Sequence, residues 1–355
     1  MNVVIAIDSF KGCLSSKEAN EAATQGIITI CPDATIYKLT ISDGGEGFLD
    51  AFHNAVGGDY VKVHVCDPLA RQIEAKYIIK ERTAVIESAQ ACGMQLLNTD
   101  ERNPMIASSY GLGQLIVHAV KRRPEKIIVG LGGSATSDVG IGMLRAIADE
   151  IKIHKSHDFY KLLLNTSFII ATDVKNPLYG TNGAAHVFAP QKGATPKMIE
   201  LLDWKARRFS QRVAEKMKFD CALNEGAGAA GGLGYAFMQF FNAECVSGIE
   251  LMLDIYKFDK LAEKTDVIIT GEGTADRQTL MGKLPVGILN HAYGKPVCLI
   301  AGKVEDRNVL IDKGFYSVDC INPPNMPISQ AIRKQVAKNN ITATTAQLMK
   351  RFINL

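Results

Sequence analysis

The stretch Val3-Val4-Ile5-Ala6-Ile7-Asp8-Ser9-Phe10-Lys11-Gly12, with Ser15 and Glu18 shortly after it, indicates the fold class of this chain. Its first five residues form an uninterrupted apolar run, as expected for a strand buried on both faces. Ser15 and Glu18 have the spacing of a capping box, which predicts a helix beginning just after Ser15. A strand that leads directly into a helix is typical of the opening of an α/β domain.

The same alternation of strand and helix recurs along much of the chain. A strand is expected over 35–40, and Asp43 and Glu46 then repeat the capping spacing before another expected helix. Three consecutive strand-like runs follow without a helix between them, which favours antiparallel pairing. These runs cover 60–66, 73–79 and 83–87.

Strands alternate with helices again from about residue 110 to the end of the chain. Helices are expected near 110–122 and 138–149 and from Thr195-Pro196 onward, and strands over 126–131, 168–172, 266–270, 296–301 and 316–321. The predicted fold class is α/β. A Rossmann-like parallel-sheet domain is formed by both chain ends, 1–60 and 260–355, and a mixed α/β domain over 61–259 is inserted in it.

Composition favours a globular enzyme that acts on a small anionic molecule. The 355 residues are 47% hydrophobic and 22% charged, and the net charge is +3. This hydrophobic content excludes a disordered chain, and the small net charge does not indicate a surface that binds nucleic acid. The eight cysteines lack the paired spacing of a zinc site or a redox dithiol. No apolar run suits a signal peptide or a membrane span, so a cytoplasmic location without membrane association is expected.

The ends of two predicted strands carry polar groups suited to phosphoryl chemistry. Asp8 is placed to hold Mg²⁺ or to accept a hydroxyl proton, and Lys11 to neutralise a phosphate or carboxylate. Glu272, with Asp276 and Lys283 after it, follows the 266–270 strand in the same way. Polar turns would present the same residue types, so both interpretations stay open.

The segment Asp43-Gly44-Gly45-Glu46-Gly47 also permits two interpretations. Its acids suit either a helix cap or magnesium. Its glycines are unnecessary for a cap and each costs up to about 1 kcal/mol in a first turn relative to alanine. We therefore expect something to approach this backbone closely.

A glycine- and hydroxyl-rich segment at 130–138 follows one strand and precedes a helix, an arrangement that suits phosphate oxygens. Asp173 ends the next strand and is either a catalytic carboxylate or a turn residue. Lys192 lies in a basic turn, and Arg71 and Arg102 are suited to clamping a carboxylate. The glycines of 226–234 are better explained by close helix packing than by a nucleotide loop.

Taken together, these segments resemble the glycerate kinase type 1 family over nearly the whole chain. The resemblance is carried by Asp8-Ser9-Phe10-Lys11-Gly12, Asp43 to Gly47, Arg102-Asn103-Pro104, Ser108-Ser109-Tyr110-Gly111, Gly132-Gly133-Ser134-Ala135-Thr136, Asp173 to Leu178, Pro190-Gln191-Lys192-Gly193-Ala194, Gly226 to Gly234, Thr270-Gly271-Glu272-Gly273, and Gln278-Thr279 before Gly282-Lys283. It implies ATP-dependent phosphorylation of D-glycerate, typically at the 2-hydroxyl, and Mg²⁺ as the partner of the nucleotide.

With this resemblance, the residues sort into expected roles, and glycerate is expected in a cleft between the two domains. The candidates are Asp173, Asp8 and Lys11 for catalysis; Ser9, Arg71, Arg102 and Lys192 for substrate; Gly44, Gly45, Gly132, Gly133, Ser134, Thr136, Gly271, Gly273 and Lys283 for phosphate or nucleotide; and Asp43, Glu46 and Glu272 for metal.

The chain departs from the family pattern at a few positions. Thr274 stands where the family usually has arginine, Ser137 where it has asparagine, and Val139 and Ile141 replace small residues. The segment 149–168 is also short for the family. These departures leave open a kinase for another small hydroxy acid and a non-catalytic metabolite-binding relative.

Two other classes of enzyme are less consistent with the sequence. The segment 130–136 alone resembles the glycine-serine loop of GHMP small-molecule kinases, but the order of the other motifs differs. A dinucleotide-dependent oxidoreductase would carry Gly-x-Gly-x-x-Gly after the first strand, where this chain has Asp8-Ser9-Phe10-Lys11-Gly12.

Overall fold

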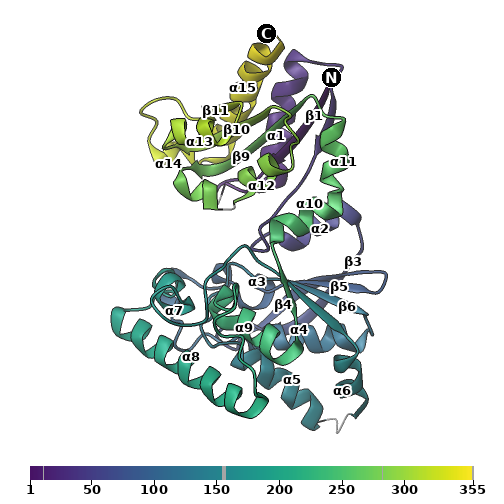
Figure 1. Cartoon of the computed structure of the whole chain (residues 1–355), viewed down its shortest axis with the longest axis vertical. Coiled ribbons are helices and arrows are strands. Elements are labelled where there is room, and N and C mark those ends of the chain that lie inside the picture. Colours follow the sequence, from purple (N-terminus) through teal and green to yellow (C-terminus); the bar gives the residue numbers. More distant parts are fainter. Residues whose placement is uncertain (11, 154–156, 282, 354–355) are drawn as a thin grey trace. The chain divides into compact units, whose positions relative to one another are not determined.

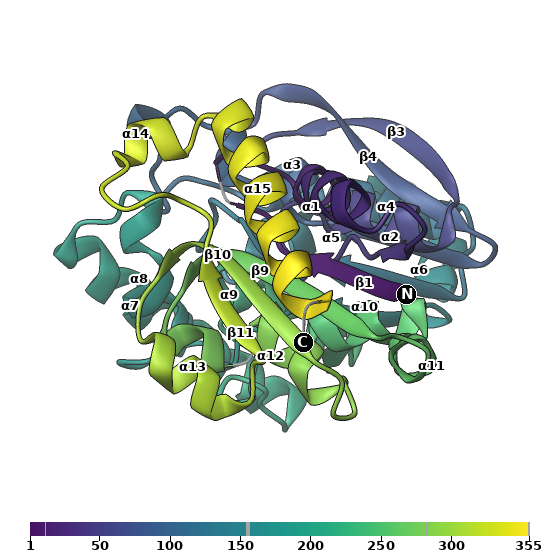
Figure 2. The same ribbon diagram turned by 90° about the horizontal axis from the view of Figure 1, so that it is seen from above.

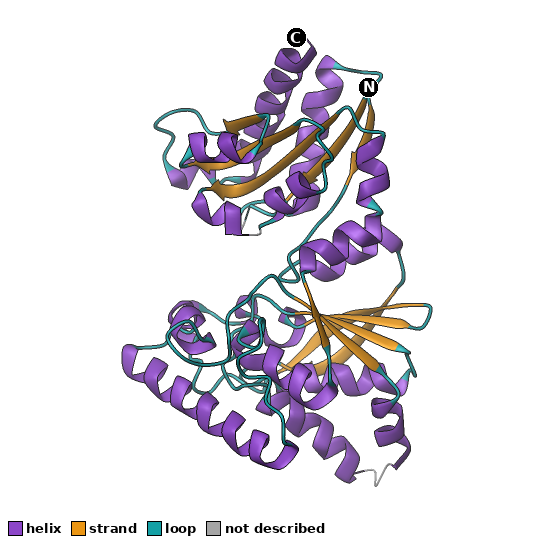
Figure 3. Cartoon of the chain, viewed as in Figure 1, coloured by secondary structure: helices purple, strands orange, loops and turns teal. Residues whose placement is uncertain are grey.

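A computed structural model describes residues 1–10, 12–153, 157–281 and 283–353, and they form two compact units. Unit 1 consists of Met1–Ser42, Asp50–Val56 and Ile249–Leu355, and unit 2 of Asp43–Leu49 and Gly57–Gly248. Figure 3 shows strands and helices in both. Within the described residues, no helix is both long and apolar enough to cross a membrane.

Unit 1 is built on a parallel sheet with the strand order β11-β10-β9-β1-β2. The two ends of the chain therefore share one sheet, as the alternating pattern predicts. Its elements are β1 (Asn2–Ile7), α1 (Ser16–Ile30), β2 (Thr35–Lys38), α11 (Phe258–Glu263), β9 (Val267–Ala275), α12 (Leu284–Asn290), β10 (Val297–Val304), α13 (Arg307–Lys313), β11 (Ser317–Cys320), α14 (Ile328–Ala331), α15 (Lys334–Ile353) and the 3-10 helix η4 (Arg277–Met281). Two helices begin in unit 2 and continue in unit 1: α2 (Phe48–Val56) and α10 (Gly248–Tyr256).

Helices α1 and α15 pack side by side over one face of this sheet, as Figures 1 and 2 show. Ser15 and Glu18 form the predicted capping box at the start of α1. Gly26 allows the two helices to approach closely, because a Cβ at this position would lie 2.4 Å from the carbonyl oxygen of Thr342. Alternate residues of β1, β9 and β10 pack beneath both helices.

Unit 2 is built on a mixed sheet with the strand order β3-β4-β5-β6-β7-β8. The pairs β3–β4 and β4–β5 are antiparallel and the remaining pairs are parallel, which confirms the predicted mixed α/β architecture. Its elements are β3 (Asp59–Cys66), β4 (Gln72–Lys80), β5 (Thr83–Glu87), α3 (Ala89–Cys92), α4 (Tyr110–Lys121), β6 (Lys126–Gly130), α5 (Ile141–Ile153), α6 (His157–Leu164), β7 (Ser167–Ala171), α7 (Ala184–Phe188), α8 (Pro196–Met217), α9 (Ala229–Phe241), β8 (Glu244–Val246), and the 3-10 helices η1 (Met94–Leu96), η2 (Thr99–Glu101) and η3 (Pro190–Lys192).

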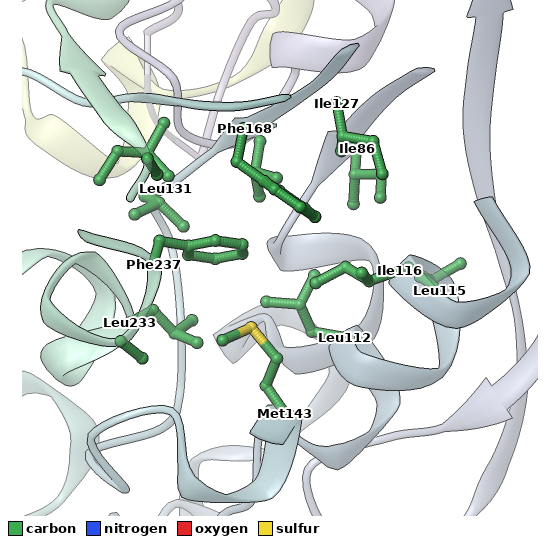
Figure 4. Close-up of a cluster of buried hydrophobic side chains, with 14 of the residues drawn as sticks. Ile86, Leu112, Leu115, Ile116, Ile127, Leu131, Met143, Phe168, Leu233 and Phe237 are labelled. Atoms are coloured by element: carbon green, nitrogen blue, oxygen red, sulfur yellow. The ribbon is translucent and has the colours of Figure 1, made fainter. Parts of the chain in front are cut away.

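The core of unit 2 lies between its sheet and helices α4, α5 and α9. Figure 4 shows Ile86, Ile127 and Phe168 of the strands facing Leu112, Leu115, Ile116, Met143, Leu233 and Phe237 of the helices. These side chains are at most 3% exposed. The core therefore fixes the ends of β5, β6 and β7, which carry most candidate residues of this unit.

Two predicted element boundaries are wrong in informative ways. Strand β9 continues through Gly271 and Gly273 to Ala275 instead of ending at residue 270. Helix α2 begins at Phe48, and Asp43 does not cap it; its Oδ1 accepts a hydrogen bond from the Gly45 amide, 2.9 Å away.

Candidate active site

The carboxyl ends of the parallel strands β5 to β8 meet at one edge of the sheet in unit 2. Segment 131–138 follows β6, Asp173 lies just beyond β7, and Ser247 follows β8. The Ser247 hydroxyl donates a short hydrogen bond to Oδ1 of Asp173. This edge therefore combines a glycine-rich loop with an oriented, partly buried carboxylate, at the usual ligand-binding end of an α/β sheet.

Several backbone amides of residues 132–136 are unused as hydrogen-bond donors. This segment is called the 132–136 loop. The Ala135 amide donates to the Cys92 carbonyl oxygen at 2.8 Å, whereas the amides of Gly132, Gly133 and Ser134 find no acceptor among the described residues. Gly133 is exposed and left-handed, with φ of 64°. Consecutive amides free of backbone partners are the donors from which anion-binding nests are built.

Asp138 anchors the chain at the end of this segment. Its Oδ2 accepts hydrogen bonds from the amide and hydroxyl of Ser109 at 2.9 and 2.8 Å and from the Gly142 amide at 3.0 Å. Its Oδ1 accepts from the Gly140 amide at 3.1 Å. Asp138 thus joins the start of α4 to the turn before α5, a positional role that its place in a glycine-rich motif does not reveal.

Lys192 contacts the 132–136 loop from the interior of unit 2, and its side chain is 3% exposed. Its Nζ donates to the Thr136 carbonyl oxygen at 2.6 Å and to the Ser134 hydroxyl oxygen at 3.1 Å. No carboxylate of the described residues forms an ion pair with it. Burial lowers the pKa of this ammonium to about 8, although Cys92 and Asp138 nearby act in the opposite direction.

The two candidate arginines have different surroundings. Arg71 is held by Asp67 and Glu101, each 2.6 Å from a guanidinium nitrogen. Arg102 forms no ion pair with the described residues, and its buried Nε lacks an acceptor. Its backbone lies against the lysine turn, since a Cβ on Gly193 would be 2.4 Å from the Arg102 carbonyl oxygen. Arg102 is therefore the arginine whose charge is available to a ligand.

Of the glycines in 43–47, Gly44 is explained by close contact with the protein's own backbone, whereas a Cβ on Gly47 would meet no atom within 4 Å. A Cβ on Gly44 would lie 2.2 Å from the Ala171 carbonyl oxygen, and one on Gly132 would lie 2.4 Å from Cα of Gly45. The predicted close approach is real, and the approaching group is the backbone of β7 and of the 132–136 loop. The start of α2 is instead served by the buried carboxylate of Glu87, which accepts from the Leu49 amide at 3.0 Å.

Asp43 and Glu46 suit a magnesium ion better than Glu272 does. No group of three His, Cys, Asp or Glu side chains within the described residues is placed to hold a metal. A nucleotide-bound Mg²⁺ needs only one or two carboxylates, because phosphates and water supply its other ligands. Both residues are exposed, and only Oδ1 of Asp43 has a hydrogen-bond partner among the described residues.

A second polar cluster lies at the carboxyl edge of the sheet in unit 1. Glu272, 5% exposed, accepts from the Thr279 hydroxyl at 2.5 Å and from Nζ of Lys283 at 3.0 Å. Burial raises the pKa of the Glu272 carboxyl despite these two partners. Asp8 follows β1 beside β9, and its Oδ1 accepts from the Ser9 amide at 2.6 Å. Lys11 is outside the described residues.

Gly271 and Gly273 lie within β9 and not in a loop. Gly271 is paired with Ile7 of β1 and with Ile300 of β10. A Cβ at Gly271 would lie 2.5 Å from the Ile300 carbonyl oxygen, whereas one at Gly273 would meet no atom closer than 4.0 Å. Gly271 is thus explained by packing within the sheet.

The glycines of 226–234 serve close packing, as predicted. A Cβ on Gly231 would lie 2.0 Å from the Thr136 carbonyl oxygen, and Gly231 and Gly232 have φ of 70° and 93°. The backbone of 226–234 therefore packs against the backbone of the 132–136 loop at Thr136. Ser247, Thr279 and Glu87 are absent from the sequence-derived candidates, because each is recognised only through a partner brought near by the fold.

Comparison with known proteins assigns this chain to one family. The family model described as the glycerate kinase family matches residues 3–353. The chain is 38% identical to a glycerate kinase of Bacillus cereus, over 98% of this chain and 97% of that protein. It is 35% identical to the glycerate 2-kinase of Escherichia coli, over 98% of each chain.

A solved structure agrees with these sequence relatives. It is a crystal structure of a glycerate kinase 2 from Salmonella typhimurium LT2, 35% identical, with a TM-score of 0.79 and coverage of 100% of this chain and 98% of that one. With matches over the full length of both sequence and fold, this chain belongs to the glycerate kinase family.

Proposed function

We propose that this chain transfers the γ-phosphoryl group of ATP to D-glycerate, at the 2-hydroxyl. The observation that carries the proposal lies at the edge of the unit 2 sheet, where amides of the 132–136 loop without acceptors adjoin the buried cation Lys192. The backbone of Arg102 packs against Gly193 next to Lys192, and neither cation has a carboxylate partner among the described residues. Such an edge suits an oxyanion, and the substrates of the reaction are both anions. The glycerate 2-kinase of Escherichia coli among the relatives supports the 2-hydroxyl.

Within unit 2, Asp173 is the proposed residue that orients the reacting hydroxyl and accepts its proton. The short hydrogen bond from Ser247 fixes one carboxylate oxygen. Phosphoryl transfer depends mainly on alignment and charge neutralisation, so a carboxylate held in one orientation is well suited to the task. Asp8 and Lys11 remain the candidates for catalysis in unit 1, with Ser9 a candidate for substrate binding.

The substrate carboxylate is proposed to bind Arg102, since Arg71 is already held by two acids. Phosphate oxygens are proposed to accept hydrogen bonds from the amides of Gly132, Gly133 and Ser134. Lys192 holds this loop in place through its hydrogen bond to the Thr136 carbonyl oxygen. Gly44 and Gly45 hold this loop in place through backbone contact. Asp43 and Glu46 would hold Mg²⁺, which neutralises phosphate charge when bound.

In unit 1, Lys283 is proposed to assist phosphate binding, and Glu272 to orient Lys283. Both oxygens of Glu272 already accept hydrogen bonds, so its proposed task is positional, in place of the metal role predicted from sequence. Gly271 gives the strand beside Asp8 its close packing, and Gly273, with open space around it, remains a candidate for phosphate binding.

A coupled assay tests the proposal directly. Formation of ADP would be followed with D-glycerate, L-glycerate and other small hydroxy acids. The product would then be treated with enolase alone, and in parallel with enolase plus phosphoglycerate mutase. Enolase alone acts on 2-phosphoglycerate, so phosphoenolpyruvate in the first reaction supports the 2-hydroxyl. Phosphoenolpyruvate only in the second would assign the 3-hydroxyl, and no ADP with any acid would refute the kinase.

A further inference from the structure

The buried charge of Lys192 has no carboxylate counter-ion among the described residues. Its Nζ contacts only the Thr136 carbonyl oxygen and the Ser134 hydroxyl oxygen among the described residues. Burying an ammonium without a paired carboxylate carries a large free-energy penalty, and two neutral oxygens offset it only in part. A structural lysine would be expected to pair with an acid, so the missing counter-ion points to a ligand.

The position of Lys192 shows where that counter-ion would bind. Ser134 accepts from Lys192 and is 3% exposed, and no described residue accepts its own hydroxyl proton. Its amide and those of Gly132 and Gly133 are also unused. The buried side of the loop thus contacts the Lys192 ammonium, and the exposed side, at Gly133, is open to an anion from solvent. A cation donating to a hydroxyl strengthens that hydroxyl as a donor to an anion.

We propose that Lys192 is a positioning residue that acts through Ser134 as the buried counter-charge of an oxyanion on the 132–136 loop, so that anion binding is coupled to proton uptake by Lys192. This inference rests on the proposed function for the identity of the anion, which is either a nucleotide phosphate or the glycerate carboxylate. The two share the chemistry of an oxyanion accepting from amides and from one hydroxyl.

Among Lys192 and its ionisable neighbours, Lys192 is the group whose charge changes near pH 8. Burial lowers its pKa to about 8, so about half of these side chains are neutral at pH 8 without ligand. Burial raises the pKa of the Cys92 thiol to about 12, so Cys92 stays protonated. The remaining charged group facing Lys192 is Asp138, which is held by Ser109, Gly140 and Gly142. An anion nearby favours the ammonium and raises its pKa.

Calorimetric titration of the full chain in two buffers of different ionisation enthalpy tests the coupling. ADP and D-glycerate would be titrated separately at pH 6, 8 and 9. At pH 8 we expect Lys192 to take up at most about half a proton with the anion that occupies the loop, and at pH 6, where Lys192 is already charged, we expect none with glycerate. The other anion should show no uptake, which identifies the source. Uptake is measured least ambiguously with glycerate, whose carboxylate does not titrate in this range, whereas a terminal phosphate has a pKa of about 6.

Variants separate the coupling from simple structural support. Lys192→Met should weaken binding at pH 7 by about tenfold or more and abolish the proton uptake. Arg102→Met removes a cation that is charged at every pH used, so it should weaken binding but retain the uptake. Lys216→Met, at an exposed position of α8, should change neither.

Wild-type binding without proton uptake at pH 8 and 9, or uptake that persists in Lys192→Met, would overturn the proposal. The wild-type measurement decides the question even if Lys192→Met fails to fold. A chain that phosphorylates glycerate but binds both anions without uptake would refute this inference alone, whereas a chain that binds neither anion would refute the proposed function.

Discussion

The 132–136 loop of unit 2 and the 270–273 segment of unit 1 have similar sequences but different structures. Both place glycines beside a hydroxyl residue at the end of a buried strand. In unit 2 the strand stops at Gly130, and after Leu131 the amides of Gly132 to Ser134 find no acceptor among the described residues. In unit 1 the strand continues to Ala275 between two neighbours, which constrain its backbone.

The charged groups beside the two segments differ as well. Lys192 beside the loop of unit 2 has no carboxylate partner within the described part of the chain, while Glu272 in unit 1 accepts hydrogen bonds from Thr279 and Lys283. A glycine-rich motif therefore indicates an anion site only where its amides are left unpaired and where an unpaired positive charge is close. Four predictions test this contrast.

The largest effect is expected at the carboxyl edge of unit 2. Asp173→Asn should lower kcat by about 10² to 10⁴, because the amide cannot accept the hydroxyl proton, and should change KM far less. Steady-state kinetics with D-glycerate measures this, and Asp158→Asn, at an exposed position of α6, is the matched control. Full kcat in Asp173→Asn would remove this residue from the mechanism.

The second largest effect is expected at Asp138, which anchors the end of the 132–136 loop, and it should be seen in the stability of the fold. Asp138→Ala removes the acceptor of four hydrogen bonds, from Ser109, Gly140 and Gly142. We expect the free energy of unfolding to fall by about 3 kcal/mol, as donors of a partly buried turn lose their acceptor. Urea unfolding measures the loss. A change within experimental error would show that the loop holds its shape without this anchor.

Substituting one glycine in each segment compares the two directly. Gly132→Ala places a Cβ 2.4 Å from Cα of Gly45, so two backbones must separate, and we expect a loss of about 2 kcal/mol together with weaker anion binding. Gly273→Ala meets no atom closer than 4.0 Å and should change stability by no more than about 0.5 kcal/mol. Thermal unfolding and activity of both proteins check this. Equal losses would contradict the contrast between loop and strand.

The smallest effect concerns the buried acid of unit 1. Burial raises the pKa of Glu272 in the folded chain above its usual 4.5, so the folded state binds this proton more tightly than the unfolded state does. Stability from this group is therefore fully present below pH 4.5 and declines as pH rises through the raised pKa. Glu272→Gln should flatten this part of the stability profile, measured by urea unfolding at several pH values. Glu215→Gln, at an exposed position of α8, should leave the slope unchanged.

Local patterns were sufficient to predict much of the fold. The capping box of Ser15 and Glu18 and the Thr195 cap with Pro196 depend on residues a few positions apart, and both are present in the structure. The same logic failed for Asp43, because the buried carboxylate of Glu87 takes the place of a local cap at the start of α2. A residue 38 positions from Leu49 is beyond any local pattern.

The sequence by itself determined the alternating α/β order, the two-part organisation into a parallel and a mixed sheet, and the polar residues at the strand ends, because periodicity and capping act over short distances. The tertiary structure decided which glycines pack against backbone and which leave amides free. It also decided that Arg71 is paired with two acids, while no carboxylate of the described residues pairs with Arg102 or Lys192. Burial and ion pairing depend on neighbours brought together from distant parts of the chain, and these set the charge available to a ligand.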